Sequence, residues 1–356
     1  MDYAICGIQQ IGIGNDNVYK TWEFYRKYLG MDLPIFDEAA IAGLMLPYTD
    51  GEARKRHAVL ALNYQGGGGI EIWQYTERKP VLPKPDVKIG DLGIYCVKYK
   101  CKDALKTYQF YKDEGLKVLS SPQQSPDGVL HFFLQDLHGN LVEIVESTNW
   151  FANTGQLTGG VFGCSIGVSD MDKSLVFYSD ILGYDHIIYD ETSTFGDLKD
   201  LNDGSVKMRR VLLTHSGKRK GPFAELLGSS QIELTQLIDT KANKIFEGRS
   251  WGDPGYIHLC FDVLYMDNLK KYAEEKGHPF TVDSAGSFDM GEAAGRFCYT
   301  EDPDGTLIEF VETHKIPIMK KYNWYLDLRK RTRTKALPAW MLWAMSLGRV
   351  KTSVLK

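Results

Sequence analysis

The sequence lacks long apolar runs, paired cysteines and an N-terminal signal segment, and each absence excludes a class of protein. No apolar stretch approaches the roughly 20 residues of a membrane span, so we expect no transmembrane segment. Met1 is followed almost directly by a strand pattern, without the apolar core of a signal peptide. The six cysteines form no CxxC pair, and several lie in apolar strand patterns. Buried reduced thiols are therefore expected, which indicates a cytoplasmic protein.

The formal charge of −4 conceals an asymmetry between the two ends of the chain. From Lys315 onward, eleven Lys and Arg residues stand against one acid, Asp327, so the rest of the chain is acidic. An acidic body argues against nucleic acid as the main partner. At 356 residues the chain is long enough for two domains with sizeable cores.

An internal repeat organises most of the chain, and its last copy shows the pattern most clearly. A strand at 256–263 carries His258, a helix follows over 266–276 and stops at Gly277, and a Pro-Asp-Gly hairpin leads into a strand with Glu309. Equivalent strand–helix–strands modules recur, and the first two are duplicated as the third and fourth. The four modules span residues 5–76, 90–147, 161–240 and 254–313.

Two motifs recur in register. The helix ends FYRKYLG at 24–30 and FYSDILG at 177–183 match each other, as do the hairpins DLHGNLVE at 136–143 and DPDGTLIE at 302–309. With these motifs the chain resembles the vicinal oxygen chelate superfamily, which includes glyoxalase I, extradiol dioxygenases and bleomycin-resistance proteins. The resemblance covers roughly residues 5–313.

The resemblance implies an α+β fold of four βαβββ modules, paired into curled mixed sheets around a divalent metal. We divide the chain into a first pair of modules (1–150), a second pair (151–314) and a basic, aromatic C-terminal extension (315–356). In the family, ligands come from the first and last strand of each module. The first-strand positions hold Gln10, Asp91 (Leu92 in a slipped register), Gly163 and His258, and the last-strand positions hold Glu71, Glu143, Glu233 and Glu309. Alternation favours Asp91 over Leu92.

Two pairings of the modules remain open, and each predicts a different site. If the first pairs with the fourth, one site collects Gln10, Glu71, His258 and Glu309, which matches the Gln/Glu/His/Glu set of glyoxalase I. If neighbours pair, as in extradiol dioxygenases, Gly163 stands where that family places a histidine. The two-His-one-carboxylate set for Fe(II) would then lack one His.

The glyoxalase-like pairing implies a lyase, isomerase or epimerase acting on a small oxygenated substrate. The predicted ligands suit Zn, Ni, Co, Mn or Fe without choosing among them. Such a metal would chelate adjacent oxygens and stabilise an enediolate, with Glu309 as base and ligand. The alternatives are an extradiol-type ring-cleaving dioxygenase and a non-catalytic small-molecule binding protein. The sequence also leaves open whether the protein forms a homodimer.

Two glutamates, a glycine-rich run and the C-terminal extension lie outside the predicted metal site. Glu143 and Glu233 are interpreted as structural or vestigial. The run from Gln65 to Gly69 lacks the Lys and helix of a phosphate loop, so we expect a flexible connection near the mouth of the site. For the C-terminal extension, one interpretation is a basic amphipathic segment for a membrane surface or an acidic ligand. We favour the other, in which Trp324, Trp340 and Trp343 pack against the modules.

Overall fold

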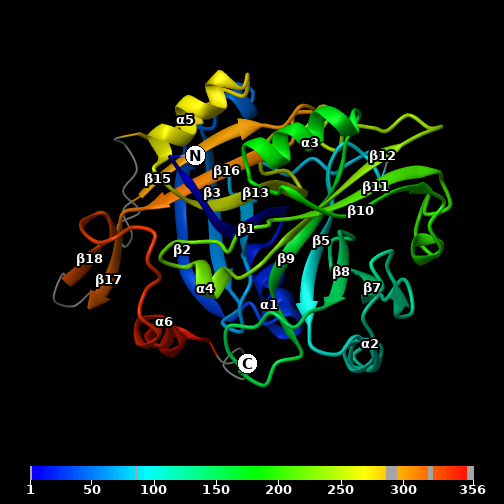
Figure 1. Ribbon diagram of the computed structural model, residues 1–356, viewed down its shortest axis with the longest axis horizontal. Coiled ribbons are helices and arrows are strands. Elements are labelled where there is room, and N and C mark those ends of the chain that lie inside the picture. Colours follow the sequence, from blue (N-terminus) through cyan, green and yellow to red (C-terminus); the bar gives the residue numbers. More distant parts are fainter. Residues whose placement is uncertain (1, 85, 286–294, 320–323, 351–356) are drawn as a thin grey trace.

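Two curled sheets form the molecule, and helices lie at their periphery (Figure 1). The computed structural model describes residues 2–84, 86–285, 295–319 and 324–350. Each sheet has eight strands and combines two modules. The expected α+β fold of four βαβββ modules is confirmed.

The first sheet unites the first and fourth modules. Its strand order is β14-β15-β16-β13-β1-β4-β3-β2. The strands of the first module are β1 (Ala4–Asn15), β2 (Leu33–Ala42), β3 (Arg54–Leu62) and β4 (Gly69–Tyr75). Those of the fourth are β13 (Gly255–Leu264), β14 (Val282–Asp283), β15 (Gly295–Glu301) and β16 (Leu307–Thr313). The antiparallel contact of β1 with β13 joins the two modules.

The second sheet unites the second and third modules in the order β10-β11-β12-β9-β5-β8-β7-β6. The second module supplies β5 (Gly93–Cys101), β6 (Gln123–Gln124), β7 (Leu130–Gln135) and β8 (Leu141–Glu146). The third supplies β9 (Thr158–Gly167), β10 (His186–Ser193), β11 (Met208–Thr214) and β12 (Gln231–Leu237). Of the two pairings that the sequence left open, the structure shows the one that joins the first module with the fourth. The division at residue 150 remains a prediction about domain boundaries.

Each module has one main helix, and side-chain caps fix where three of them begin. These helices are α1 (Val18–Leu29), α2 (Ala104–Asp113), α3 (Met171–Asp180) and α5 (Met266–Glu275). Asn17, Asp103 and Asp170 each accept a hydrogen bond from the backbone N–H three residues on, which satisfies an otherwise unpaired helix donor. At the end of α1, Gly30 adopts φ 65°, a left-handed conformation that a side chain would disfavour.

The two repeated motifs contact each other, which explains why they recur together. The Tyr25 hydroxyl, at the end of α1, donates to Asp136 Oδ2 in the hairpin of the second module at 2.8 Å. Tyr178, at the end of α3, donates in the same way to Asp302 Oδ2 of the fourth module at 2.9 Å. Each aspartate also accepts two backbone N–H groups of its own turn. A helix and a hairpin thus link the first module with the second and the third with the fourth, while the sheets link the first with the fourth and the second with the third.

The segment from Gln65 to Gly69 is buried, so its interpretation as a flexible connection near the site mouth was wrong. It crosses between the two sheets: Gly67 N–H donates to Leu226 O, and Gly68 forms an isolated bridge with Val161 of β9. Gly67 has φ 112°, and a Cβ there would lie 2.8 Å from the Gly160 backbone. Glycine is required here because two backbones meet without room for side chains. One hydrophobic core continues through both sheets.

The C-terminal extension forms the hairpin β17 (Lys315–Met319) and β18 (Trp324–Asp327), and the short helix α6 (Ala339–Met345). The expectation that its tryptophans pack against the modules was wrong for Trp340 and Trp343, which are 63% and 58% exposed. The side chain of Trp324 lies outside the described residues.

All six cysteines are buried free thiols, as expected. Among the described residues, no helix has the length and apolar character for crossing a membrane.

Candidate metal centre

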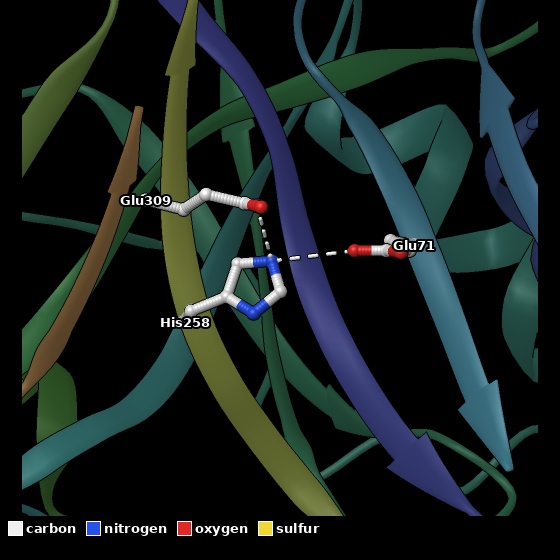
Figure 2. A group of neighbouring side chains, drawn as sticks. All are labelled: Glu71, His258 and Glu309. Carbon is white, nitrogen blue, oxygen red and sulfur yellow. Dashed lines mark ion pairs between the residues drawn. The ribbon is translucent and has the colours of Figure 1, made fainter. Parts of the chain in front are cut away.

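Four residues predicted from the repeat converge on one side of the first sheet. Gln10 lies on β1, Glu71 on β4, His258 on β13 and Glu309 on β16, four strands that are neighbours in the sheet. The parallel pairing of β1 with β4 and of β13 with β16 sets the two glutamates on either side of the central strands. Figure 2 shows the imidazole of His258 between the two carboxylates. We call these four residues the candidate centre.

The ligand atoms of the candidate centre lie within reach of one small cation. His258 Nε2 is 3.0 Å from Glu309 Oε2 and 3.5 Å from Glu71 Oε2 (Figure 2). One ligand atom from each of these three residues lies within 4.8 Å of the other two. Gln10 Nε2 donates to Glu309 Oε2 at 3.4 Å, so the amide joins the same group. Oxygen and imidazole ligands at this spacing suit a divalent first-row metal.

The residues of the candidate centre are buried, so each of their polar atoms needs a hydrogen-bond partner within the protein or a bound cation. Gln10 is 4% exposed and His258 is fully buried. Within the described structure, the amide oxygen Oε1 of Gln10 has no hydrogen-bond partner, and the polar atoms nearest His258 Nε2 are the carboxylate oxygens of Glu309 and Glu71. A buried polar atom without a partner costs free energy, typically about 1–3 kcal/mol. The unpartnered amide oxygen, together with the two carboxylates and the imidazole, fits a site for a cation.

The protonation of His258 depends on its carboxylate neighbours. Burial by itself lowers the pKa of this imidazole, but the charges and hydrogen bonds of Glu309 and Glu71 outweigh it and raise the pKa to about 9. In the absence of a metal, the protonated ring is therefore the counter-charge of the two glutamates. Its other nitrogen, Nδ1, lies 3.5 Å from the hydroxyl of Tyr299. A ring that gives Nε2 to a metal carries its proton on Nδ1, where the Tyr299 oxygen can accept it.

Gly12 lies at the candidate centre, and the sequence analysis did not identify it. It pairs with His258 across β1 and β13, and it is also opposite Glu71 of β4. A Cβ at Gly12 would lie 2.3 Å from the His258 ring carbon Cε1 and 2.8 Å from Nε2. The missing side chain provides the space that the imidazole fills. The sequence shows only a glycine within an alternating strand. Its role becomes clear once the strand that pairs with β1 is known, because His258 lies opposite it.

Aromatic side chains form one wall beside the centre. The Trp251 ring is nearly parallel to the His258 ring, with centroids 6.4 Å apart and an interplanar angle of 14°. Trp251 also contacts Trp73 of β4 edge-on, and Tyr299 meets His258 edge-on. Trp251 lies outside the strands, where the sequence offered no repeat register to identify it. Its indole Nε1 is buried and has no partner among the described residues.

The equivalent position in the second sheet contains an ion network. Glu143 and Glu233 occupy the positions of Glu309 and Glu71, and Lys98 Nζ lies 2.7 Å from an Oε2 atom of each. Arg210 binds Glu233 and also Asp197, at 2.9 Å from Asp197 Oδ2. His131 Nδ1 lies 2.7 Å from Glu143 Oε1. These buried cations neutralise the carboxylates from within the protein, in agreement with the structural interpretation of Glu143 and Glu233.

Charge compensation is visible in the pKa values of this network. Burial alone raises the pKa of Glu233, but Arg210 and Lys98 lower it well below its usual range. Burial likewise lowers the pKa of His131, and its bonds to Asp197 and Glu143 reverse this and raise it to about 9. The network therefore consists of charged groups whose charges offset one another.

The expectation that Asp91 stands in ligand position was wrong. Asp91 precedes β5, and its carboxylate accepts the backbone N–H groups of Lys88 and Asn243. In the strand register, Cys96 is the counterpart of His258. His258 pairs with Gly12, which is opposite Glu71, and Cys96 pairs with Ser165, which is opposite Glu233. The alternation argument failed because Asp91 lies before β5, five residues ahead of Cys96, and because a register shift between Ile94 and Cys96 breaks the alternation along the strand.

Comparison with known proteins agrees with this architecture. The sequence model of the Glyoxalase/Bleomycin resistance protein/Dioxygenase superfamily matches residues 7–144 and 160–310. Glyoxalase I from Zea mays is 14% identical, with a TM-score of 0.53 over 87% of this chain and 92% of that protein. A putative dioxygenase from Bacillus subtilis is also 14% identical, with a TM-score of 0.56 over 98% of this chain and 97% of that one. A comparison with curated protein sequences gives no match.

At this identity the two solved structures show the fold alone. The family match covers both halves of the chain and includes all four positions of the candidate centre. With the repeated modules and the paired sheets, it establishes that the chain belongs to the glyoxalase/bleomycin resistance protein/dioxygenase superfamily.

Proposed function

We propose that the protein is a metal-dependent lyase, isomerase or epimerase of the glyoxalase type, acting on a small oxygenated substrate. The observation that carries the proposal is the convergence of Gln10, Glu71, His258 and Glu309 from both ends of the chain, with the buried amide oxygen of Gln10 left without a partner among the described residues. These residues would hold a divalent cation. When bound, that cation would act as a Lewis acid on two neighbouring substrate oxygens and stabilise an enediolate.

The protein's own groups supply the rest of the chemistry. Glu309 lies next to His258 and has an 8% exposed side chain, so its carboxylate can take a proton from a substrate carbon with little competition from water. His258 is held in place by Tyr299 on one side and by Trp251 against its face. Trp73, Trp251 and Tyr299 form a rigid apolar wall, against which an uncharged part of the substrate can pack.

The ring-cleaving dioxygenase is the less supported catalytic alternative. The cluster Glu71, His258 and Glu309 contains one imidazole among the described residues, whereas the Fe(II) set of that chemistry uses two. A non-catalytic binding protein is the second alternative. The aromatic wall of Trp73, Trp251 and Tyr299 favours it, since such walls hold apolar ligands without chemistry.

Metal content and proton exchange test the proposal together. We expect about one divalent ion per chain after loading with Zn, Ni, Co or Mn, as expected for one closed ligand set. His258→Ala and Glu309→Gln should lose the ion. Glu143→Gln, at the position equivalent to Glu309 in the second sheet, is the matched control and should keep it. The loaded wild type, but not Glu309→Gln, should also catalyse deuterium uptake from D2O by α-hydroxycarbonyl compounds.

The alternatives give different results. Undiminished metal content in His258→Ala would end the proposed ligand set. Oxygen uptake with catechols and iron would support the dioxygenase. A chain that binds no metal but takes up aromatic ligands would be a binding protein.

A further inference from the structure

The short helix α6 presents an apolar stripe to solvent. Trp340, Trp343 and Leu347 follow one another at intervals of three and four residues, so they share one face of the helix and the turn after it. They are 63%, 58% and 72% exposed. The opposite face holds Leu342, which is 1% exposed and packs with Leu328 and Leu337. The helix is therefore anchored by one side and exposes bulky apolar groups on the other.

No described residue covers this stripe. Neither indole has a ring partner or a cation above it in the part of the chain that the structure describes, whereas buried aromatics such as Trp73 and Trp251 pack edge-on against each other. Figure 1 places α6 at the lower edge of the molecule, where its Met345 packs against Leu33 and Leu62 of the first sheet. Exposing two tryptophans and a leucine on one helical face is unfavourable in water, because apolar surface remains hydrated. The arrangement indicates a surface that meets a partner.

Cationic groups lie around the same helix. Lys330 and Lys335, in the segment leading into α6, are exposed and have no ion-pair partner among the described residues. A cavity of about 760 Å3 separates Leu337, Ala339 and Leu342 from the loop at residues 215–219. Two further basic residues, Lys218 and Arg219, line this cavity. The acid there, Glu225, is paired with Lys218 at 2.8 Å.

We propose that α6 and its basic flanks dock the protein on a membrane surface rich in anionic lipid headgroups. Tryptophan is enriched where hydrocarbon meets water, and a helix with Trp and Leu on one face and Lys or Arg nearby lies in that interface. The phosphate and carboxylate headgroups match the cationic flanks, whose charge is attracted to such a surface. Because the rest of the chain is acidic, only this end is attracted, and the charge asymmetry orients the protein.

A second copy of the chain fits the stripe less well. A stable dimer buries about 800 Å2 on each partner, more than two partly exposed indoles and one leucine supply. Insertion into an interface needs no such area, because each side chain enters the lipid separately. The stripe and the unpaired lysines therefore favour a lipid surface over self-association.

Vesicle sedimentation of the full chain tests this proposal. We expect binding to phosphatidylcholine vesicles with about 30% phosphatidylserine, and little binding to phosphatidylcholine alone. Binding should weaken in about 0.5 M salt, which screens the headgroup charge. The variant Trp340→Ala/Trp343→Ala should bind at least about tenfold more weakly, since two interfacial anchors are lost. Leu105→Ala, a 63% exposed residue on α2, is the matched control and should bind like the wild type.

Each other result overturns the proposal. It fails if the wild type does not bind these vesicles, or if the double variant binds them as well as the wild type. It also fails if light scattering shows a dimer that the double variant abolishes, because the stripe is then an interface between copies. Thermal unfolding of the double variant should match that of the wild type, since both indoles are exposed. The test is independent of the metal centre.

Discussion

The ammonium nitrogen of Lys98 lies 2.7 Å from Oε2 of Glu233, at the place in the second sheet that corresponds to the candidate centre of the first. A second carboxylate, Glu143, is equally close to the same nitrogen. Both sheets thus bring two glutamates together from two modules. One sheet neutralises them with a lysine, and the other places an imidazole and an amide beside them. The two sheets therefore differ in the groups next to the carboxylates: the ammonium group of Lys98 in the second sheet, and the imidazole of His258 with the amide of Gln10 in the first.

Removing the lysine should destabilise the protein strongly. Lys98→Met leaves Glu143 and Glu233 buried with less compensation, and breaking such a buried pair typically costs about 3–5 kcal/mol. The free energy of unfolding in urea measures this effect. Lys173→Met is the control, because its side chain is 73% exposed and its pair with Asp170 contributes little. A loss below about 1 kcal/mol for Lys98→Met would contradict the role given to the network.

Lys100, two residues further along β5, should give the opposite result. It is fully buried, and its Nζ donates to the backbone oxygen of Asn149. Burial lowers the pKa of this amine from 10.5 to about 8. Between pH 8 and 10.5 the unfolded chain holds a proton that the folded chain has released, so stability rises with pH in this window.

Lys100→Met should therefore stabilise the protein by about 1–2 kcal/mol at pH 7 and remove this rise. Urea unfolding at pH 7 and at pH 9.5 gives both quantities. Both variants replace a buried lysine of β5 by methionine. If the loss of any buried lysine had the same effect, Lys98→Met and Lys100→Met would change the free energy of unfolding in the same direction.

Asp262 on β13 should make the protein less stable as the pH rises. It is 2% exposed, and its Oδ2 has no hydrogen-bond partner among the described residues. Burial, together with the charge of Glu312, raises the pKa of Asp262 from 3.8 to about 7, against a smaller opposing effect of Cys6. Between these values the folded state binds a proton that the unfolded state lacks, so stability falls from pH 3.8 to pH 7.

Asp262→Asn should be more stable than the wild type by about 2–4 kcal/mol at pH 8 and should lack this decline. The midpoint of urea unfolding across pH 4 to 8 measures it. Asp239→Asn, an exposed residue, is the control and should keep the wild-type profile. Parallel profiles for Asp262→Asn and the wild type would show that the carboxyl group titrates normally.

Gly12→Ala should disturb the candidate centre while leaving the sheet in place. The new methyl group would overlap the His258 ring and displace it, at a cost of about 1–3 kcal/mol. Metal binding should weaken by at least about tenfold, as judged by equilibrium dialysis, because a ligand leaves its position. Gly43→Ala is the control, since nothing lies within 4 Å of its Cβ position. Wild-type affinity in Gly12→Ala would show that His258 is not a ligand.

Local signals allowed much of the fold to be predicted from the sequence. The helix ends at Gly30 and Gly183 depend on neighbouring residues, and the glutamates recur at fixed spacing from their turns. The four positions of the candidate centre could be proposed because the repeat carries their register. Which modules pair is a property of strand order, and no local pattern encodes it.

The remaining errors have physical causes. The prediction for Asp91 was wrong because this residue lies before β5 and because a register shift in β5 breaks the alternation of its residues. Lys98 was overlooked because its partners Glu143 and Glu233 lie 45 and 135 residues away in sequence, although a lysine in an apolar strand is itself a signal of a buried charge. The segment from Gln65 to Gly69 was misread because glycine permits both mobility and close packing, and only the neighbouring backbone distinguishes them.

The pairing of the first module with the fourth has a consequence for how the protein matures. Gln10 and Glu71 leave the ribosome early, but His258 and Glu309 are made only after the second and third modules. If the proposed centre binds a metal, a nascent chain would carry half of its ligands for most of its synthesis and would not trap a cation prematurely. Loading would report that all four modules have been translated and assembled, so metal capture would be the last step of folding.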